Sequence, residues 1–288
     1  MIAHVAEAGE DRGRVVFRLG SSGRLSDIAL EAAVRVAQAF QSEIESLFIE
    51  DRQLFDLASF PFAREISLSG RGSRALSPDD ITREMRLLAS ALQRKVLHMA
   101  RSCEVPVRAR IVRDDPLQAL ASACTESGPW NVVALGEPFG GGQMPVLAEL
   151  FSAVQGTTGI ILAGPEARHT SGPVVAVIED LERVPPMLRA VERLASVTGG
   201  EPSLLIIEEG AERLAWMEGQ VRLALANSAA IKLDSLDMAG RDAAAIADML
   251  RRAGAGFVIA HFGGRLASGE DNLVPLAAML EGALFLVR

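Results

Sequence analysis

The chain has 288 residues, of which 49% are hydrophobic and 23% charged, a balance typical of a globular protein that buries a full core. Its length predicts about two units of roughly 100 to 150 residues each. A formal net charge of -8 argues against a general nucleic-acid binder, because such proteins usually carry a basic patch or stripe. Cys103 and Cys124 lack metal-ligand spacing, so they predict reduced thiols without a zinc site or disulfide framework.

Membrane and export signals are not evident in the sequence. No uninterrupted apolar run reaches the length of about 18 residues that a membrane helix needs. The N-terminal stretch also lacks the apolar core of a signal peptide. We therefore expect a cytoplasmic protein with no membrane partner.

The first half alternates strands and helices. RVVFRL at 14–19 predicts a strand that ends at a Gly-Ser turn, and the helix after it has Ser26 or Asp27 placed as its N-cap. Further strands are predicted at 42–49, 105–112 and 131–135. Further helices are predicted at 81–103 and 117–126. Residues 50–80 follow no single period, so they predict an insertion whose apolar first part packs as a short helix.

The second half repeats this order without the insertion. A polar joint at 164–172 separates a first domain at 1–165 from a second, shorter domain at 173–288. Strands are predicted at 173–178, 203–207, 230–236 and 257–260, and helices at 184–197, 211–225 and 243–252. The stretch 131–164, with a strand, a glycine-rich turn, a helix and a strand, has a shorter copy at 256–288.

Strands that alternate with helices predict parallel sheets joined by right-handed crossovers. The predicted fold class is therefore α/β, with two tandem open five-stranded parallel sheets that carry helices on both faces. Ligands of such sheets bind at the carboxyl ends of the strands near the topological switch point. In this chain those ends are Leu19-Gly20, Gly136 to Gly142, Glu179-Asp180 and His261 to Gly264.

Three motifs carry a family resemblance: VVFRLGSSGRLSDIALEAA, VRARIVRDDPLQALASAC and NVVALG followed by glycines. Together they resemble the universal stress protein family, present as a tandem pair with degenerate nucleotide loops. The resemblance implies a Rossmann-like fold similar to the adenine nucleotide alpha hydrolases. It also implies that 159–162 pairs with 283–287, which makes one chain an internal pseudo-dimer, and it leaves a homodimer possible.

In nucleotide-binding members of that family, the loop has Gly, two residues, Gly, nine residues, Gly, then Ser or Thr. Small residues at this spacing let backbone N–H groups close on a triphosphate. Gly136 fits the first position, but the next glycine comes one residue late and Leu150-Phe151 follow where the Gly-Ser pair is expected. Leu19 holds the place of the ribose-binding acid. The candidate nucleotide contacts are Gly20, Ser21, Gly136, Gly140, Gly141, Gly142 and Ser152.

In the second half, His261 replaces the first glycine, and Glu179 or Asp180 could supply the acid. The glycines at 140–142 form either a phosphate cradle or a plain turn. No spacing predicts a catalytic or metal site. The leading hypothesis is a non-enzymatic stress-response or regulatory protein.

Two alternatives remain open. One is a first domain that binds ATP or a related nucleotide, with slow hydrolysis. The other is a protein partner that docks on the insertion, where Phe55, Phe60 and Phe62 lie near Arg64. The same aromatic residues would serve equally to pack the insertion on its own domain.

Overall fold

A layer of strands forms the centre of the molecule. The computed structural model describes residues 13–21, 23–66, 72–126, 130–137, 149–150, 152, 157–226, 231–267 and 270–288. The strands of the first half are β1 (Arg14–Leu19), β2 (Glu43–Asp51), β5 (Val107–Asp114), β6 (Asn131–Leu135) and β7 (Thr157–Ala163). Those of the second half are β8 (Val174–Ile178), β9 (Pro202–Glu208), β10 (Lys232–Asp237), β11 (Phe257–His261) and β12 (Ala283–Val287).

These strands form one continuous sheet, in the order β10-β9-β8-β11-β12-β7-β6-β1-β2-β5. Each half has the same internal order, with its first strand between its second and its fourth, and its strands pair in parallel. The α/β class with parallel sheets is confirmed. The two predicted five-stranded sheets join edge to edge, so they form one 10-stranded sheet. The domain boundaries at 165 and 173 stay a prediction.

The two sets join through β7 and β12, which pair antiparallel from Ala283–Ala163 to Val287–Gly159. This register confirms the predicted pairing of 159–162 with 283–287. A Cβ atom on Gly159 would lie 2.7 Å from the ring of Phe285, so glycine makes room for that ring. The pairing also removes two sheet edges from water, where unpaired strands invite aggregation.

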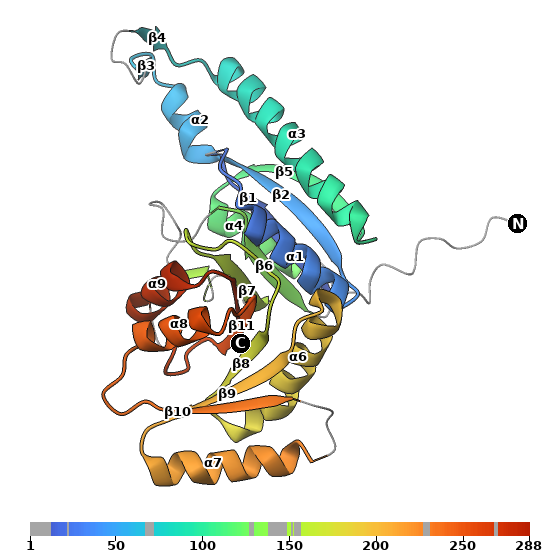
Figure 1. The fold of residues 1–288 in the computed structure, drawn as a ribbon. Coiled ribbons are helices and arrows are strands. Elements are labelled where there is room, and N and C mark those ends of the chain that lie inside the picture. Colours follow the sequence, from blue (N-terminus) through green and yellow to red (C-terminus); the bar gives the residue numbers. More distant parts are fainter. Residues whose placement is uncertain are drawn as a thin grey trace, which may run out of the picture.

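Helices cover both faces of the sheet (Figure 1). One face carries α1 (Asp27–Ala39), α3 (Pro78–Ser102), α6 (Val184–Thr198) and α7 (Ala211–Ala224). The other carries α4 (Pro116–Thr125), α8 (Ala243–Arg252) and α9 (Glu270–Met279). Phe17 and Leu19 enter the first core and Val16 enters the second, as expected for a parallel strand buried on both faces. Each core contains residues of both halves.

Side-chain caps fix where helices begin. Ser26 Oγ accepts a hydrogen bond of 3.1 Å from the N–H of Ala29, which starts α1 as predicted. Asp115 Oδ1 accepts one of 2.9 Å from the N–H of Leu117, and Pro116 holds the first helical position of α4. In the described part of the chain, no helix is both long and apolar enough to cross a membrane.

The insertion consists of α2 (Arg52–Ala58), which confirms the predicted short helix, and a ribbon of β3 (Arg64–Ile66) and β4 (Ser73–Ala75), which the sequence did not predict. The ribbon lies at the end of the molecule, beyond the start of α3 (Figure 1). At the root of the insertion, the Arg113 guanidinium lies 3.6 Å from the centre of the Phe55 ring and donates a 2.9 Å hydrogen bond to Glu50. These contacts anchor α2 on β5.

Candidate functional site

The strand order reverses at two places, and each is a candidate binding site. The first switch point lies between the carboxyl ends of β1 and β6, and the second lies between those of β8 and β11. Ligands of parallel sheets bind at such places. The structure brings Gly20, which follows β1, against the turn after β6 where Gly136 lies. Two of the predicted contact residues therefore share the first switch point.

Gly136 has a structural role at the first switch point. Its N–H donates a 3.0 Å hydrogen bond to the carbonyl of Arg18, and its own carbonyl accepts a 2.8 Å bond from Ser26. A Cβ atom at this position would collide with the Arg18 carbonyl. Glycine is therefore required for the close approach of β6 to β1, and both backbone polar groups of Gly136 are already hydrogen-bonded within the protein.

A carboxylate already lies at the first switch point. The side chain of Glu137 lies so close to Gly20 that a Cβ atom on this glycine would collide with the carboxylate. Glu137 Oε2 is 3.7 Å from the guanidinium of Arg18, whose side chain is 10% exposed. Burial lowers the pKa of Arg18, and the charge of Glu137 opposes that shift. Glu137 is thus the counter-ion of a buried arginine, in the place where a phosphate would be expected.

The structure describes two of the other predicted contacts, Ser21 and Ser152. Ser21 is exposed and lines a cavity beneath the insertion. Ser152 is exposed, and its hydroxyl donates a 3.0 Å hydrogen bond to the carbonyl of Glu149. Leu150 is fully buried in the core on the α4 face, so its position packs the fold. Three predicted contacts lie outside the described residues: Gly140, Gly141 and Gly142.

A carboxylate also lies at the second switch point. Glu179 accepts hydrogen bonds from the backbone N–H groups of Arg265 and Leu266, the second of 3.1 Å. In a nucleotide site, backbone N–H groups of this loop would be free for phosphate oxygens. Asp180, the other predicted acid, caps the short helix η1 (Leu181–Arg183) through a 3.0 Å bond from Glu182.

A cavity of about 280 Å³ opens at the second switch point, and its lining includes His261, Arg183 and Gly264. The Glu179 carboxylate lies against Gly264, where a Cβ atom would collide with it. Burial lowers the pKa of His261, and the nearby charge of Arg183 adds to the effect while Asp180 opposes it. His261 is therefore mainly neutral at pH 7.

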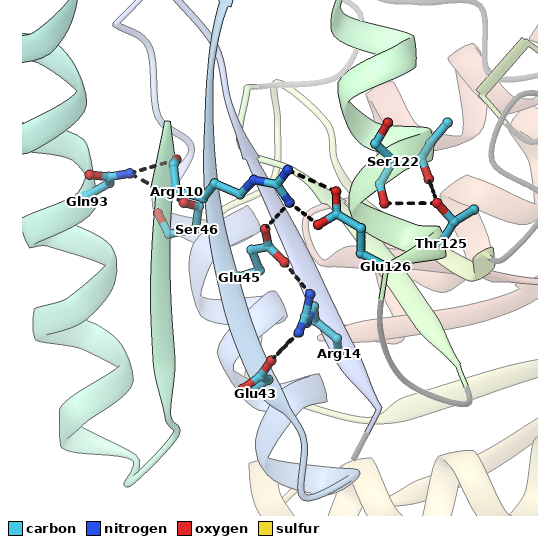
Figure 2. Close-up of polar contacts among 10 residues, drawn as sticks. Arg14, Glu43, Glu45, Ser46, Gln93, Arg110, Ser122, Thr125 and Glu126 are labelled. Carbon is cyan, nitrogen blue, oxygen red and sulfur yellow. Dashed lines mark hydrogen bonds and ion pairs between the residues drawn. The ribbon is translucent and has the colours of Figure 1, made fainter. Parts of the chain in front are cut away.

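A buried ionic network crosses the first half of the sheet, and it was missed in the sequence (Figure 2). Glu45 on β2 is fully buried and lies 2.5 Å from a guanidinium nitrogen of Arg14 and 3.5 Å from one of Arg110. Arg14 also contacts Glu43 at 2.7 Å, and Arg110 reaches Glu126 after α4. The alternation of Glu43, Ile44 and Glu45 was a signal, but the partners of the two glutamates depend on the strand register.

Cys124 does not offer a reactive thiolate. Cys124 is buried, and burial raises the pKa of its thiol to about 11, so it is a thiol and not a thiolate at neutral pH. Among the residues that the structure describes, no group of three or more histidine, cysteine, aspartate or glutamate side chains could hold a metal ion.

No protein-family model and no curated protein matches the chain. Solved structures do. A candidate universal stress protein from Pseudomonas aeruginosa UCBPP-PA14 aligns with a TM-score of 0.57 at 13% identity, over 96% of this chain and 93% of that chain. A functionally unknown protein from Pseudomonas aeruginosa PAO1 gives 0.56 at 14% identity, over 96% and 92%.

A universal stress protein from Archaeoglobus fulgidus DSM 4304 aligns with a TM-score of 0.55 at 14% identity, over 95% of this chain and 96% of that chain. The chain has the fold of the universal stress proteins. Identities of 13% to 14% make this a likeness of fold, and function has to be argued from the residues of the two switch points.

Proposed function

We propose that this protein is a regulatory module of the universal stress protein type, which acts in a stress response by binding and not by catalysis. We also propose that neither switch point accepts a nucleotide. The carboxylates of Glu137 and Glu179 at the two switch points carry the proposal. A nucleotide phosphate there would have to compete with a carboxylate that already holds Arg18 at the first switch point and the N–H groups of Arg265 and Leu266 at the second. Two unit charges 4 Å apart repel by about 1 kcal/mol in water and about 4 kcal/mol near a protein surface.

The backbone around the switch points supports the same proposal. Phosphate loops work through free N–H groups, whereas the N–H groups of Gly136, Arg265 and Leu266 are bonded within the chain. Leu150 fills the core at a position where a phosphate loop requires a small residue. A nucleotide would have to displace core packing as well as a carboxylate.

Calorimetric titration with ATP and Mg²⁺ tests this proposal. We expect no saturable heat and no thermal shift at millimolar nucleotide for the wild-type protein. The neutral variants Glu137→Gln and Glu179→Gln should remove the repulsion at one switch point each, while Glu43→Gln, far from both, is the control. Saturable ATP binding by the wild-type protein would refute the proposal and favour the nucleotide-binding alternative.

The surface of the insertion favours a second candidate function, in which a protein partner docks there. Phe60 and Phe62 stack with ring centres 5.4 Å apart, and the exposed fractions are 49% for Phe60, 75% for Phe62 and 68% for Ile66. Aromatic residues are enriched in interface centres. Replacing both phenylalanines by serine should abolish co-purification of such a partner without changing the melting temperature, and a matched Leu223→Ser variant should retain the partner.

A further inference from the structure

The insertion covers a cavity of about 300 Å³ between β4 and the first turns of α3. Its apolar walls include the buried Ile81 and Met85 and the half-buried Leu54 and Leu88. The β3–β4 ribbon lies beyond the start of α3 (Figure 1), and Arg74 of β4 reaches Glu84 of α3. In the second half, α7 begins three residues after β9 ends, so no insertion covers a corresponding cavity there.

Among the described residues, the lining of this cavity carries more negative than positive charge. It includes three carboxylates, Glu65, Asp80 and Glu84, and one guanidinium, Arg74. Arg74 Nε lies 2.5 Å from Glu65 Oε2, and Arg74 Nη2 lies 3.2 Å from Glu84 Oε1. One guanidinium shared by two carboxylates leaves a net negative charge. Asp80 pairs with Arg83, which is outside the lining.

The start of α3 does not reverse this charge. A helix N-terminus carries the equivalent of about half a positive charge, and acidic residues in the first turn offset it. Asp79 and Asp80 both lie in the first turn of α3. The mouth of the cavity therefore attracts a cation, and it repels phosphate and carboxylate groups.

We propose that this cavity binds an amphipathic organic cation, which consists of a primary amine on an aliphatic or aromatic body. The leucine, isoleucine and methionine side chains accept the body, as apolar walls do in small-molecule sites, and Met85 can adjust to its shape. The carboxylates at the mouth pair with the ammonium group. Neither Glu137 nor Glu179 lines the cavity, and the amine is titrated without nucleotide, so this test does not depend on whether the switch points accept a nucleotide.

Three probes with the same body and different heads test the proposal on the full chain: 4-phenylbutylamine, 4-phenylbutanol and 5-phenylpentanoate. Calorimetric titration should give the tightest binding for the amine and the weakest for the carboxylate. The side chains of Glu65 and Glu84 are 47% and 63% exposed, so solvent screens them. We therefore expect the amine to bind about two- to fivefold tighter than the alcohol, with a smaller ratio at high salt.

Two neighbouring leucines on α3 provide a matched pair of variants. Leu88 lines the cavity, whereas Leu87 is 68% exposed on the outside of the same helix. Leu88→Trp should fill the cavity and abolish binding of the amine, and Leu87→Trp should leave it unchanged. Glu84→Gln, at an exposed position that keeps the fold, should bring the affinity of the amine down to that of the alcohol.

Several results would overturn the proposal. The first is the absence of saturable amine binding, and the second is equal binding of all three probes. The third is amine binding that survives Leu88→Trp while circular dichroism shows that the variant is folded. The fourth comes from light scattering. A dimer that does not bind the amine, and that dissociates when Phe60 and Phe62 are replaced, would assign this region to contact with a second copy of the chain. Nucleotide binding at a switch point would leave the amine result unaffected.

Discussion

Replacing Glu45 by leucine should destabilise the protein strongly. Glu45 is 0% exposed and Arg14 is 5% exposed, and their charged groups lie 2.5 Å apart. Loss of the glutamate leaves a buried guanidinium with a weaker counter-ion, Glu43, whose side chain is 28% exposed. Removal of one partner from a buried ion pair costs about 3 to 5 kcal/mol. We expect about 3 kcal/mol here, because Glu43 continues to contact Arg14.

Two further variants separate the buried charge from the loss of a contact. Glu43→Leu removes the other carboxylate of Arg14 and should cost less than about 1 kcal/mol, because this ion pair is partly solvated. The double variant Arg14→Met, Glu45→Leu removes both buried charges. Apolar residues of similar volume often replace a buried ion pair without loss, so the double variant should be more stable than Glu45→Leu alone.

Urea titration followed by circular dichroism measures these differences in the free energy of unfolding. For a protein of this size, a loss of about 3 kcal/mol lowers the melting temperature by about 6 °C. Equal unfolding midpoints for Glu43→Leu and Glu45→Leu would refute the assignment of the network as a buried structural ion pair. A double variant less stable than Glu45→Leu would refute the argument from the unpaired charge.

Three other regions give predictions. Gly219→Ala should raise stability by about 1 kcal/mol in thermal denaturation, because a Cβ atom there meets open space within a helix. Gly136→Ala should lower stability, because its Cβ atom would collide with the Arg18 carbonyl. Burial lowers the pKa of His261 in the folded protein. As the pH falls through about 6.5, this histidine is protonated in the unfolded chain before it is protonated in the folded protein, so the free energy of unfolding decreases. His261→Asn should reduce that fall in urea titrations, and an unchanged slope would contradict it. Iodoacetamide should label Cys103 and spare buried Cys124 in the native protein, as mass spectrometry can check.

Much of the fold follows from the sequence for local reasons. Strand and helix periods are short-range signals, and alternation of the two restricts the topology to parallel sheets. Ser26 was one of the two caps predicted for α1, and it fills that place. The pairing of β7 with β12 rested on a family resemblance, and the register from Ala283 to Val287 confirms it.

The candidate site was less accessible to sequence reasoning, because its decisive contacts are made by side chains from distant segments. Glu137 was visible only as a residue after Gly136, and nothing local indicates that it reaches Gly20. The same holds for Glu45, whose partners Arg14 and Arg110 lie on strands 31 and 65 residues away. Only the register of β1, β2 and β5 brings those charges together.

The two switch points reach the same electrostatic state by different routes. Glu137 follows β6, the fourth strand of its half, whereas Glu179 follows β8, the first strand of the other half. Each carboxylate passes a glycine, Gly20 or Gly264, where a Cβ atom would collide with it. Gly20 and Gly264 therefore make room for a carboxylate of the chain itself. A carboxylate at both switch points, from a different position in each half, is what the proposed exclusion of nucleotides requires. The insertion, which the described residues show in the first half alone, is then the surface that distinguishes the two halves.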